Sequence, residues 1–450
     1  MLSNFQQLLS LYFHADNLSW IMAALIIFVI ATVATFSKRY MTGDRYYRRH
    51  AGDIFILGAG VLTMAFADHL LALLVGWAIS NLYLVRLMVH KKVWQAAKNS
   101  GSLALKTLTV GSVALAGAAW LLANASGSSS IHAILAQAPT LAPFPLTLAT
   151  CLIALAALTQ SAAWPFHKWL TSSLNSPTPV SALMHAGLVN GGGFLLARFA
   201  PLFLNQPVLL QLLFTVGLLT ALLGTFWKLL QSDIKRMLAC STMAQMGFMI
   251  AQCGMGLFAP AVSHLVWHGL FKAYLFLGTG SVISEKIRKN PFSSITLKSF
   301  IPASLWGAVG ALAFAQAAAI PLQFKDTSSI MIGLAFMACM QLAGTVITRN
   351  SLPKLLGALI SSILLGGLYG GSIRLIEIAL APLHLWQPQP LNWLYTTGFI
   401  AMAFVWLAMN INLIARLQNS PLWQRLYFAA LNGSQPHPAT VTATRSTYQF

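Results

Sequence analysis

The sequence predicts an all-α membrane protein that crosses the bilayer about thirteen times. Of its 450 residues, 57% are hydrophobic and 8% are charged, whereas a soluble domain has about 25% charged residues. The apolar residues fall into runs of about 16–24 residues. A helix needs roughly 20 residues to cross a hydrocarbon core of about 30 Å. Composition and run length together exclude an ordinary soluble fold.

These runs are expected to form a single transmembrane domain over residues 1–416, followed by a cytoplasmic tail over 417–450. The predicted spans are 19–37, 52–67, 70–89, 104–123, 143–162, 180–199, 207–229, 237–256, 261–284, 301–320, 329–347, 355–378 and 394–415. No cleavable signal peptide is expected, because the N-terminal stretch lacks a basic segment before its apolar residues.

The basic residues give the predicted orientation. The chain has 27 Lys and Arg but only 8 Asp and Glu, for a net charge of +19. In a soluble protein this excess would suggest a nucleic-acid partner. Here, if thirteen spans alternate, nearly all basic residues fall on one side, which the positive-inside rule makes the cytoplasm. They are Lys38, Arg39, Arg45, Arg48, Arg49, Lys91, Lys92, Lys98, Lys168, Lys228, Lys235, Arg236, Lys286, Arg288, Lys289, Lys298, Arg349, Lys354, Arg416, Arg425 and Arg445. The N-terminus is therefore expected outside, the C-terminus in the cytoplasm, and no nucleic acid as a partner.

Two basic residues depart from this pattern. Arg198 lies near the outer end of its span and is expected to snorkel outward. Lys325 lies in an outer connection beside Asp326. It is either a lone exception in a short loop or part of a segment that dips into the membrane beside a water-filled path.

The most informative stretch is PAVSHLVWHGLFKAYLFLGTGSVI, residues 260–283. His264, His268 and Lys272 follow one another at intervals of four, so a helix places them on one stripe. A lysine within a membrane span is costly and is expected to face protein or water rather than lipid. Lysine in apolar surroundings and histidine can both exchange protons near neutral pH. The pattern favours a proton path, and the alternative is that these side chains only hydrogen-bond neighbouring helices.

A second irregularity follows the fifth span, in WPFHKWLTSSLNSPTPV. Three prolines, Pro165, Pro177 and Pro179, interrupt any helix here. Broken helices within a membrane are tolerated where protein or water covers the freed backbone groups, and in transporters they mark the pathway. The alternative is an ordinary cytoplasmic turn.

Residues for catalysis or metal binding are not evident. The four cysteines lie in apolar segments without C-x-x-C spacing, and no phosphate-binding glycine loop, serine-nucleophile elbow or HExxH occurs. We expect a chain that is not an enzyme, with no catalytic residues, no metal site and no cofactor of its own.

Three long motifs carry a family resemblance: PTPVSALMHAGLVNGGGFLLARF (177–199), QSDIKRMLACSTMAQMGFMI (231–250) and HLVWHGLFKAYLFLGTGSVI (264–283). They resemble the antiporter-like membrane subunits of respiratory complex I and the Mrp-type antiporters. The resemblance begins near Asp16, is strong to about residue 300 and is weak beyond it. HAGLVNGGGFL and VRLMVHKKVWQAAKNSGSLALK look most like one branch, the membrane subunit of the DAB-type inorganic carbon transporters (DabB). The resemblance implies an inverted-repeat architecture with broken helices.

The resemblance also implies roles for particular residues. The family's lysine of the ninth span is Lys272, accompanied by His264 and His268, and the histidine of the PVSALxH motif is His185. The lysine of the late broken helix corresponds loosely to Lys325.

Two positions depart from the family pattern. The usual glutamate after GW is Ala78, and the usual lysine of the fifth span is Gln160. In a Glu–Lys pair each charge shifts the pKa of the other, which the neutral side chains of Ala and Gln cannot do. One half-channel of the family's usual pattern is therefore damaged or built differently. Asp68 is a candidate acid on that side.

The function that the resemblance implies is ion conduction, with H+ preferred to Na+, in an inorganic carbon pump of the cell inner membrane. The partner would be a peripheral cytoplasmic subunit similar to β-carbonic anhydrase (DabA) that holds zinc. Two alternatives remain: a proton-pumping subunit of an NADH-quinone oxidoreductase-like or Mrp-type complex, and a scaffold that anchors a soluble enzyme and conducts nothing.

Overall fold

The computed structural model describes residues 11–283, 297–347, 351–411 and 419–441. Within these ranges the chain is almost entirely helical, and it has isolated bridges but no strand. The predicted all-α fold class is therefore confirmed. The basic residues Lys286, Arg288, Lys289, Arg349, Arg416 and Arg445 lie outside the described residues.

The chain divides into two compact units. The first comprises residues 1–253, 264–283 and 431–450. Its elements are α2 (Asn17–Tyr40), α3 (Tyr47–Phe66), α4 (Leu70–Met88), α5 (Gln95–Ser126), α6 (Ile131–Ala136), η1 (Ala138–Thr140), α7 (Pro143–Gln160), α8 (Lys168–Thr171), α9 (Thr178–Ala186), η2 (Leu188–Asn190), α10 (Gly191–Arg198), α11 (Ala200–Leu204), α12 (Pro207–Leu229), α13 (Ile234–Gly254), most of α14 (Phe258–Leu277), η3 (Gly278–Ile283) and η5 (Pro438–Thr440).

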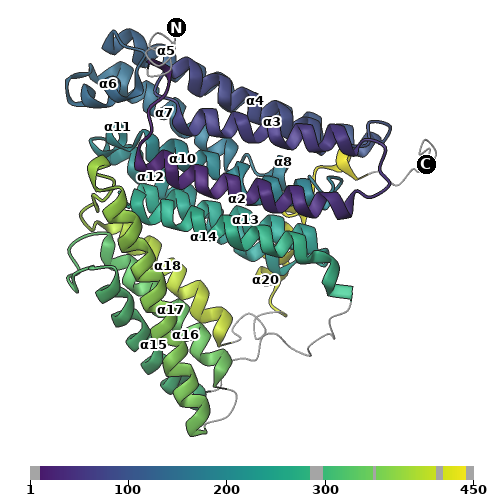
Figure 1. Ribbon diagram of the computed structural model, residues 1–450. Coiled ribbons are helices and arrows are strands. Elements are labelled where there is room, and N and C mark those ends of the chain that lie inside the picture. The colour runs from purple at the N-terminus through teal and green to yellow at the C-terminus, as the bar shows by residue number, and fades with distance from the viewer. Residues whose placement is uncertain (1–10, 284–296, 348–350, 412–418, 442–450) are drawn as a thin grey trace. The chain divides into compact units, whose positions relative to one another are not determined.

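The second unit comprises residues 254–263 and 284–430. Its elements are the start of α14, α15 (Leu297–Ala317), α16 (Ser328–Val346), α17 (Leu352–Ala379), η4 (Ala381–Leu383), α18 (Trp393–Asn410) and most of α20 (Pro421–Gly433). Within this unit α15 packs against both α16 and α17, and the three helices run together in Figure 1.

Ten stretches in the described ranges are long and apolar enough to cross a membrane. The remaining three predicted spans, 52–67, 237–256 and 261–284, correspond to α3, α13 and α14, which are helices of similar length. The mean hydropathy of these three helices is lower than that of the ten stretches because they carry polar side chains, among them the two histidines and the lysine of α14. The number thirteen itself is thus not confirmed, although a helix stands at each predicted position.

Local sequence signals set the helix ends. Asp16 caps α2, because its carboxylate accepts from the backbone N–H of Ser19 at 2.8 Å. Pro143 begins α7 and Pro207 begins α12, at positions where a helix needs no N–H donor. Gly127 ends α5 in the left-handed conformation, with φ at 67°.

Helices α3 and α4 pack closely along their length, and Figure 1 shows them side by side. At their crossing Gly60 faces Gly76. A Cβ atom added at Gly76 would lie 2.7 Å from the carbonyl oxygen of Gly60 and from the amide nitrogen of Met64. Such small-residue contacts let backbones approach within a membrane, where apolar burial gives little drive for helices to associate.

The segment after α7 is broken before α9, as its prolines predict, and the predicted span 180–199 is interrupted a second time between α9 and α10, which was not predicted. Four short helical pieces, α8, α9, η2 and α10, follow one another between residues 168 and 198. Residues 178–198 are 94% buried over their most apolar window. Protein therefore surrounds this interrupted stretch, as a membrane requires of irregular backbone.

Arg198 does not snorkel outward. It is 8% exposed and forms an ion pair with Asp16, and its guanidinium also donates to the Ser19 hydroxyl at 2.9 Å and to the Ala65 carbonyl at 3.2 Å. Burial alone would raise the pKa of Asp16. The hydrogen bond and the positive charge of Arg198 outweigh this effect and bring the pKa below its ordinary value, so the carboxylate stays ionised. The expected snorkelling was wrong because the counter-ion lies 182 positions away in the sequence.

In the second unit, Arg374 and Glu377 form an ion pair within α17, at 2.9 Å.

Candidate functional site

His264, His268 and Lys272 form a buried stripe along α14. They are 8%, 5% and 1% exposed, respectively. The rings of His264 and His268 are stacked with their centroids 6.0 Å apart, as an interval of four in a helix requires. Phe271 and Tyr274 on the same helix are 58% and 73% exposed. The titratable face therefore points into the first unit, as expected from the cost of exposing it to lipid.

The break in the neighbouring helix provides the first polar partner of the stripe. Helix α9 ends at Ala186, so the carbonyl groups of its last turn have no intrahelical N–H to accept from. The carbonyl of His185 lies 3.2 Å from Nε2 of His268. Because a carbonyl can only accept, Nε2 of His268 carries a hydrogen, and its Nδ1 is the nitrogen left to exchange a proton.

A chain of hydrogen bonds links His185 to Lys272 through α13. The Thr242 hydroxyl donates to the Leu238 carbonyl at 3.0 Å, and Lys272 Nζ donates to the same carbonyl at 3.2 Å. Nδ1 of His185 lies 3.0 Å from the Thr242 oxygen. Since that hydroxyl has already given its one hydrogen to Leu238, Nδ1 of His185 is the donor.

The charge balance of this cluster is unusual. None of the ion pairs among the described residues involves Lys272. His264 packs edge-on against Phe248 with ring centroids 5.4 Å apart, and its Nε2 has no protein partner. A buried cluster of nitrogens without a carboxylate favours states in which few of them are charged at once. It is suited to taking up one proton and passing it on.

An open cleft of about 580 Å³ lies on the face that carries the basic connections. It is lined by polar residues from the ends of α2, α4 and α13 and from the loop before α9, among them Asp44, His90, Lys91, Asn175 and Lys235. Asp44 pairs with His90 at 2.9 Å. Partial burial alone would raise the pKa of Asp44. The hydrogen bonds from His90 and from the Tyr46 amide outweigh this effect and bring the pKa below its ordinary value. Lys235 Nζ donates to the Ser176 carbonyl at 3.0 Å, beside the start of α9.

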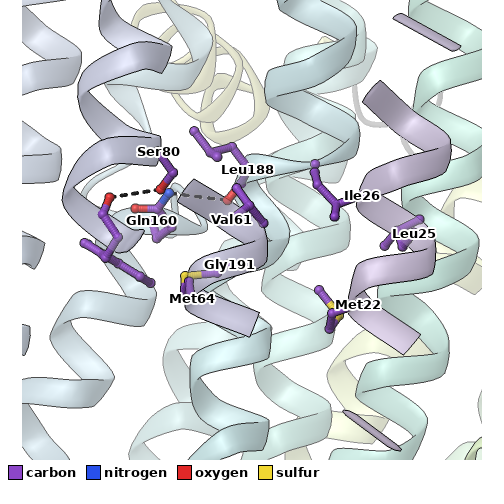
Figure 2. A pocket seen from close by; sticks show the side chains of 11 residues that line it. Met22, Leu25, Ile26, Val61, Met64, Ser80, Gln160, Leu188 and Gly191 are labelled. Carbon is purple, nitrogen blue, oxygen red and sulfur yellow. Dashed lines mark hydrogen bonds between the residues drawn. The ribbon is translucent and has the colours of Figure 1, made fainter. Parts of the chain in front are cut away.

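The other predicted site residues lie elsewhere. Gln160 is 2% exposed at the end of α7 and donates to the Asn81 side chain at 3.0 Å (Figure 2 shows Gln160 beside Ser80). Asp68 accepts from the Ser130 hydroxyl at 2.7 Å and from the His132 amide at 2.9 Å, so it holds the loop before α6. Lys325 is exposed in the connection between α15 and α16, outside any helix. The structure thus joins four of the seven predicted residues by hydrogen bonds and ring contacts. Gln160 and Asp68 have other partners within the first unit, and Lys325 belongs to the second unit.

Two groups in the cluster were not predicted, namely Thr242 and the Leu238 carbonyl. Thr242 lies in a helix that also contains Ser241, Gln245 and Gln252, so the sequence does not single it out. Their use depends on α13 lying against both α9 and α14.

Among the described residues, no group of three or more His, Cys, Asp or Glu side chains is placed to hold a metal ion.

The fold and this buried cluster define a multi-pass membrane protein of the antiporter-like class. Residues 67–352 match the family model described as NADH:quinone oxidoreductase/Mrp antiporter, transmembrane. Residues 5–50 match the N-terminal model of complex I chain 5. The chain belongs to the NADH:quinone oxidoreductase/Mrp antiporter family.

Individual relatives agree with the resemblance seen in the motifs. The probable inorganic carbon transporter subunit DabB1 of Halothiobacillus neapolitanus is 39% identical over 294 residues, which are 64% of this chain and 53% of that protein. The NADH-quinone oxidoreductase subunit L of Pseudomonas aeruginosa is 37% identical over 279 residues, 60% and 45% of the two chains. The resemblance to the carbon transporter branch is confirmed, and the matched region spans about half the length of these relatives.

The fold also matches a solved structure, that of the Mrp complex from Dietzia sp. DQ12-45-1b. The TM-score is 0.59 at 22% identity, with 93% of this chain and 52% of that chain covered. At this identity the match supports the antiporter-like fold and nothing finer.

Proposed function

We propose that this chain conducts H+ across the cell inner membrane as the membrane subunit of an energy-coupled inorganic carbon pump. The observation that carries the proposal is the buried stripe of His264, His268 and Lys272, joined to His185 by hydrogen bonds through α13. A merely structural role would need none of these groups to titrate, and hydroxyls or amides would serve it as well at lower cost.

The chemistry of the stripe favours H+ over Na+. A sodium ion needs a shell of oxygen ligands, and hard cations prefer carboxylates, carbonyls and water. The stripe offers imidazole nitrogens, which bind and release protons, and an ammonium group, which repels cations. The two carbonyls beside it, of His185 and Leu238, already accept hydrogen bonds.

The open cleft beside the start of α9 supplies the cytoplasmic mouth of the path. Its lining residues Lys91 and Lys235 belong to connections that the positive-inside rule assigns to the cytoplasm. This orientation puts the N-terminus outside and the segment after α18 in the cytoplasm.

The names of the relatives suggest what the ion flow drives. A proton moving down 100 mV releases about 2.3 kcal/mol, enough to bias a coupled step well over tenfold. The coupled step would be CO2 hydration in a peripheral cytoplasmic subunit that resembles carbonic anhydrase (DabA) and holds the zinc. The chain itself would not be an enzyme.

Replacing Lys272 with Ala tests the proposal. In cells that depend on this complex for inorganic carbon, Lys272→Ala should abolish growth at low CO2 while the partner is still recovered with the membrane subunit. Lys354→Ala, at an exposed position at the start of α17, is the matched control and should grow normally. Growth of Lys272→Ala at the control rate would reject conduction and favour a scaffold that anchors a soluble enzyme.

A second candidate is a proton-pumping subunit of a quinone-reducing or Mrp-type complex. The relative from Pseudomonas aeruginosa favours it, whereas Ala78 and Gln160 in place of the usual Glu–Lys pair disfavour it. Identifying the proteins that co-purify with the chain separates the two: a zinc-containing carbonic anhydrase-like subunit supports the carbon pump, and quinone-reductase or antiporter subunits support the alternative.

A further inference from the structure

Residues 433–441 form a segment that is seated on the first unit, and we call it the strap. The chain before it, residues 284–430, belongs to the second unit, whereas residues 431–450 belong to the first. Helix η5 within the strap packs against α5, and Figure 1 shows this part of the chain in yellow beside α8. Ser434 and Thr440 are each 4% exposed. The strap is therefore a packed part of the first unit.

The strap bonds to the loop of residues 172–177, which lies between α8 and α9. The backbone N–H of His437 donates to the Ser172 hydroxyl oxygen at 2.9 Å. In the other direction, the side-chain amide of Asn175 donates to the Thr440 carbonyl at 3.0 Å. These two bonds hold the strap and the loop against each other.

Helices on either side hold the strap itself. Near the start of α5, Nδ2 of Asn99 donates to the Ala439 carbonyl at 2.6 Å. Near the end of α12, the buried ring of Trp227 lies so close to Gly433 that a Cβ atom added to this glycine would be 3.2 Å from it. The strap therefore has contacts with α5 and α12 that do not involve the loop.

The loop depends on its neighbours for its position. The amide of Ser176 donates to the Ser173 carbonyl, and such a bond shapes the loop without tying it to a helix. Ties to the helices come from side chains: the Ser100 hydroxyl of α5 donates to the Ser172 carbonyl at 2.9 Å, and Lys235 Nζ of α13 donates to the Ser176 carbonyl at 3.0 Å. The two strap bonds add to these ties.

The loop forms one wall of the open cleft and leads into α9. Residues 174–177 line the cleft, and α9 begins at the next residue, Thr178. His185, which joins the buried cluster through Thr242, belongs to the last turn of α9. The position of the loop therefore sets the shape of the cleft and the start of the helix that carries His185.

We propose that the strap is a positioning element, which holds the loop of residues 172–177 at the mouth of the proton path. The strap acts through the loop and touches no group that carries the proton. Its effect on transport rests on the proposed function, whereas its hold on the loop does not. Loss of one strap bond should loosen the loop, because the net contribution of one hydrogen bond corresponds to a factor of about 2–12 in a local opening equilibrium.

Position 437 allows the bond to Ser172 to be tested. His437 has φ at −60° and ψ at 129°, values that proline also adopts, so His437→Pro removes the N–H donor at an unchanged φ. His437→Ala is the matched control, because it also loses the imidazole but keeps the N–H. The rigidity of proline would stabilise the strap, which is opposite to the effect expected from the lost bond.

Hydrogen exchange in the full complex, followed by mass spectrometry, measures how firmly the loop is held. Exchange of the amides in residues 172–177 should be about 2- to 12-fold faster in His437→Pro than in His437→Ala, and exchange in α3 should be equal in the two. Equal exchange in the loop would overturn the proposal.

A second pair of variants decides the question if His437→Pro does not assemble. Asn99→Ala removes a side chain that bonds to the strap and lies in α5 rather than in the loop. It should speed exchange in residues 172–177 because its effect reaches the loop through the strap. Asn124→Ala, which changes an exposed asparagine further along α5, is its control, and equal exchange in this pair would then overturn the proposal.

Proton flux in sealed vesicles separates this proposal from the proposed function. If Lys272→Met has lost its flux, His437→Pro should conduct more slowly than His437→Ala, and equal flux in these two variants would overturn the role of the strap at the mouth of the path. If Lys272→Met conducts like the wild type, the proposed function fails, and the exchange measurement still decides whether the strap holds the loop.

Discussion

Thr242 gives the sharpest test of the hydrogen-bonded chain between His185 and Lys272. Replacing it with Val keeps the shape of the side chain but removes the hydroxyl that accepts from His185 Nδ1 and donates to the Leu238 carbonyl. In the wild type the two bonds are 3.0 Å long and lie among fully buried residues. The substitution therefore leaves one imidazole N–H without a partner.

The size of the effect follows from the burial. A buried donor left without an acceptor costs about 1–3 kcal/mol, and each 1.4 kcal/mol is a factor of ten. If proton transfer requires this hydrogen bond to hold the His185 ring in place, the cost falls on the transfer step, and the rate of ion flux should fall about 5- to 150-fold. A role confined to stability would lower the melting temperature and leave the flux per folded molecule unchanged.

The assay measures proton flux in vesicles that contain the full complex, normalised to the amount of folded protein. Thr215→Val is the matched control, since its hydroxyl also bonds to a carbonyl one turn back in its helix but is exposed. We expect flux at the wild-type rate for this control. Flux at that rate in Thr242→Val, whatever its melting temperature, would refute a role for the His185–Thr242 hydrogen bond in proton transfer.

The remaining predictions concern stability. Arg198→Met should destabilise the first unit by about 3–5 kcal/mol, because it leaves the buried carboxylate of Asp16 unpaired, and thermal melting of the purified chain measures this. A contribution no larger than the value of about 0–1 kcal/mol that is usual for ion pairs at a surface would contradict this prediction. Because the pKa of Asp16 is lowered from its ordinary 3.8, its contribution to stability is present above about pH 4 and is lost as the pH falls further through the folded-state pKa. Melting curves between pH 3 and pH 7 should show this loss in the wild type but not in Asp16→Asn. The same dependence of melting temperature on pH in both proteins would rule out this contribution of Asp16. Gly76→Val should cost about 1–3 kcal/mol or more, because its side chain meets the backbone of α3, whereas the same change at Gly367, which has open space around it, should be nearly neutral.

The sequence predicted those features that depend on neighbours along the chain. The stripe on α14 follows from an interval of four residues, and the broken segment before α9 follows from Pro165, Pro177 and Pro179. Helix positions followed from runs of apolar residues, although three helices are less apolar than a membrane span usually is.

Features that depend on contacts between distant segments could not be predicted. Arg198 was expected to reach outward, but its partner Asp16 caps a helix far away in the sequence. Thr242 gave no sign that it would join His185 to the Leu238 carbonyl. Asp68 has the chemistry of a proton carrier, yet its carboxylate holds the loop before α6.

The most direct measurement of the central claim is proton flux through the complex in sealed vesicles, driven by an imposed pH gradient, for the wild type and for Lys272→Met. Methionine preserves the length of the buried side chain and removes its charge. Loss of flux to the level of empty vesicles, in a complex that is still assembled, is the predicted result. Flux in Lys272→Met equal to that of the wild type would contradict the claim that the buried stripe carries the proton.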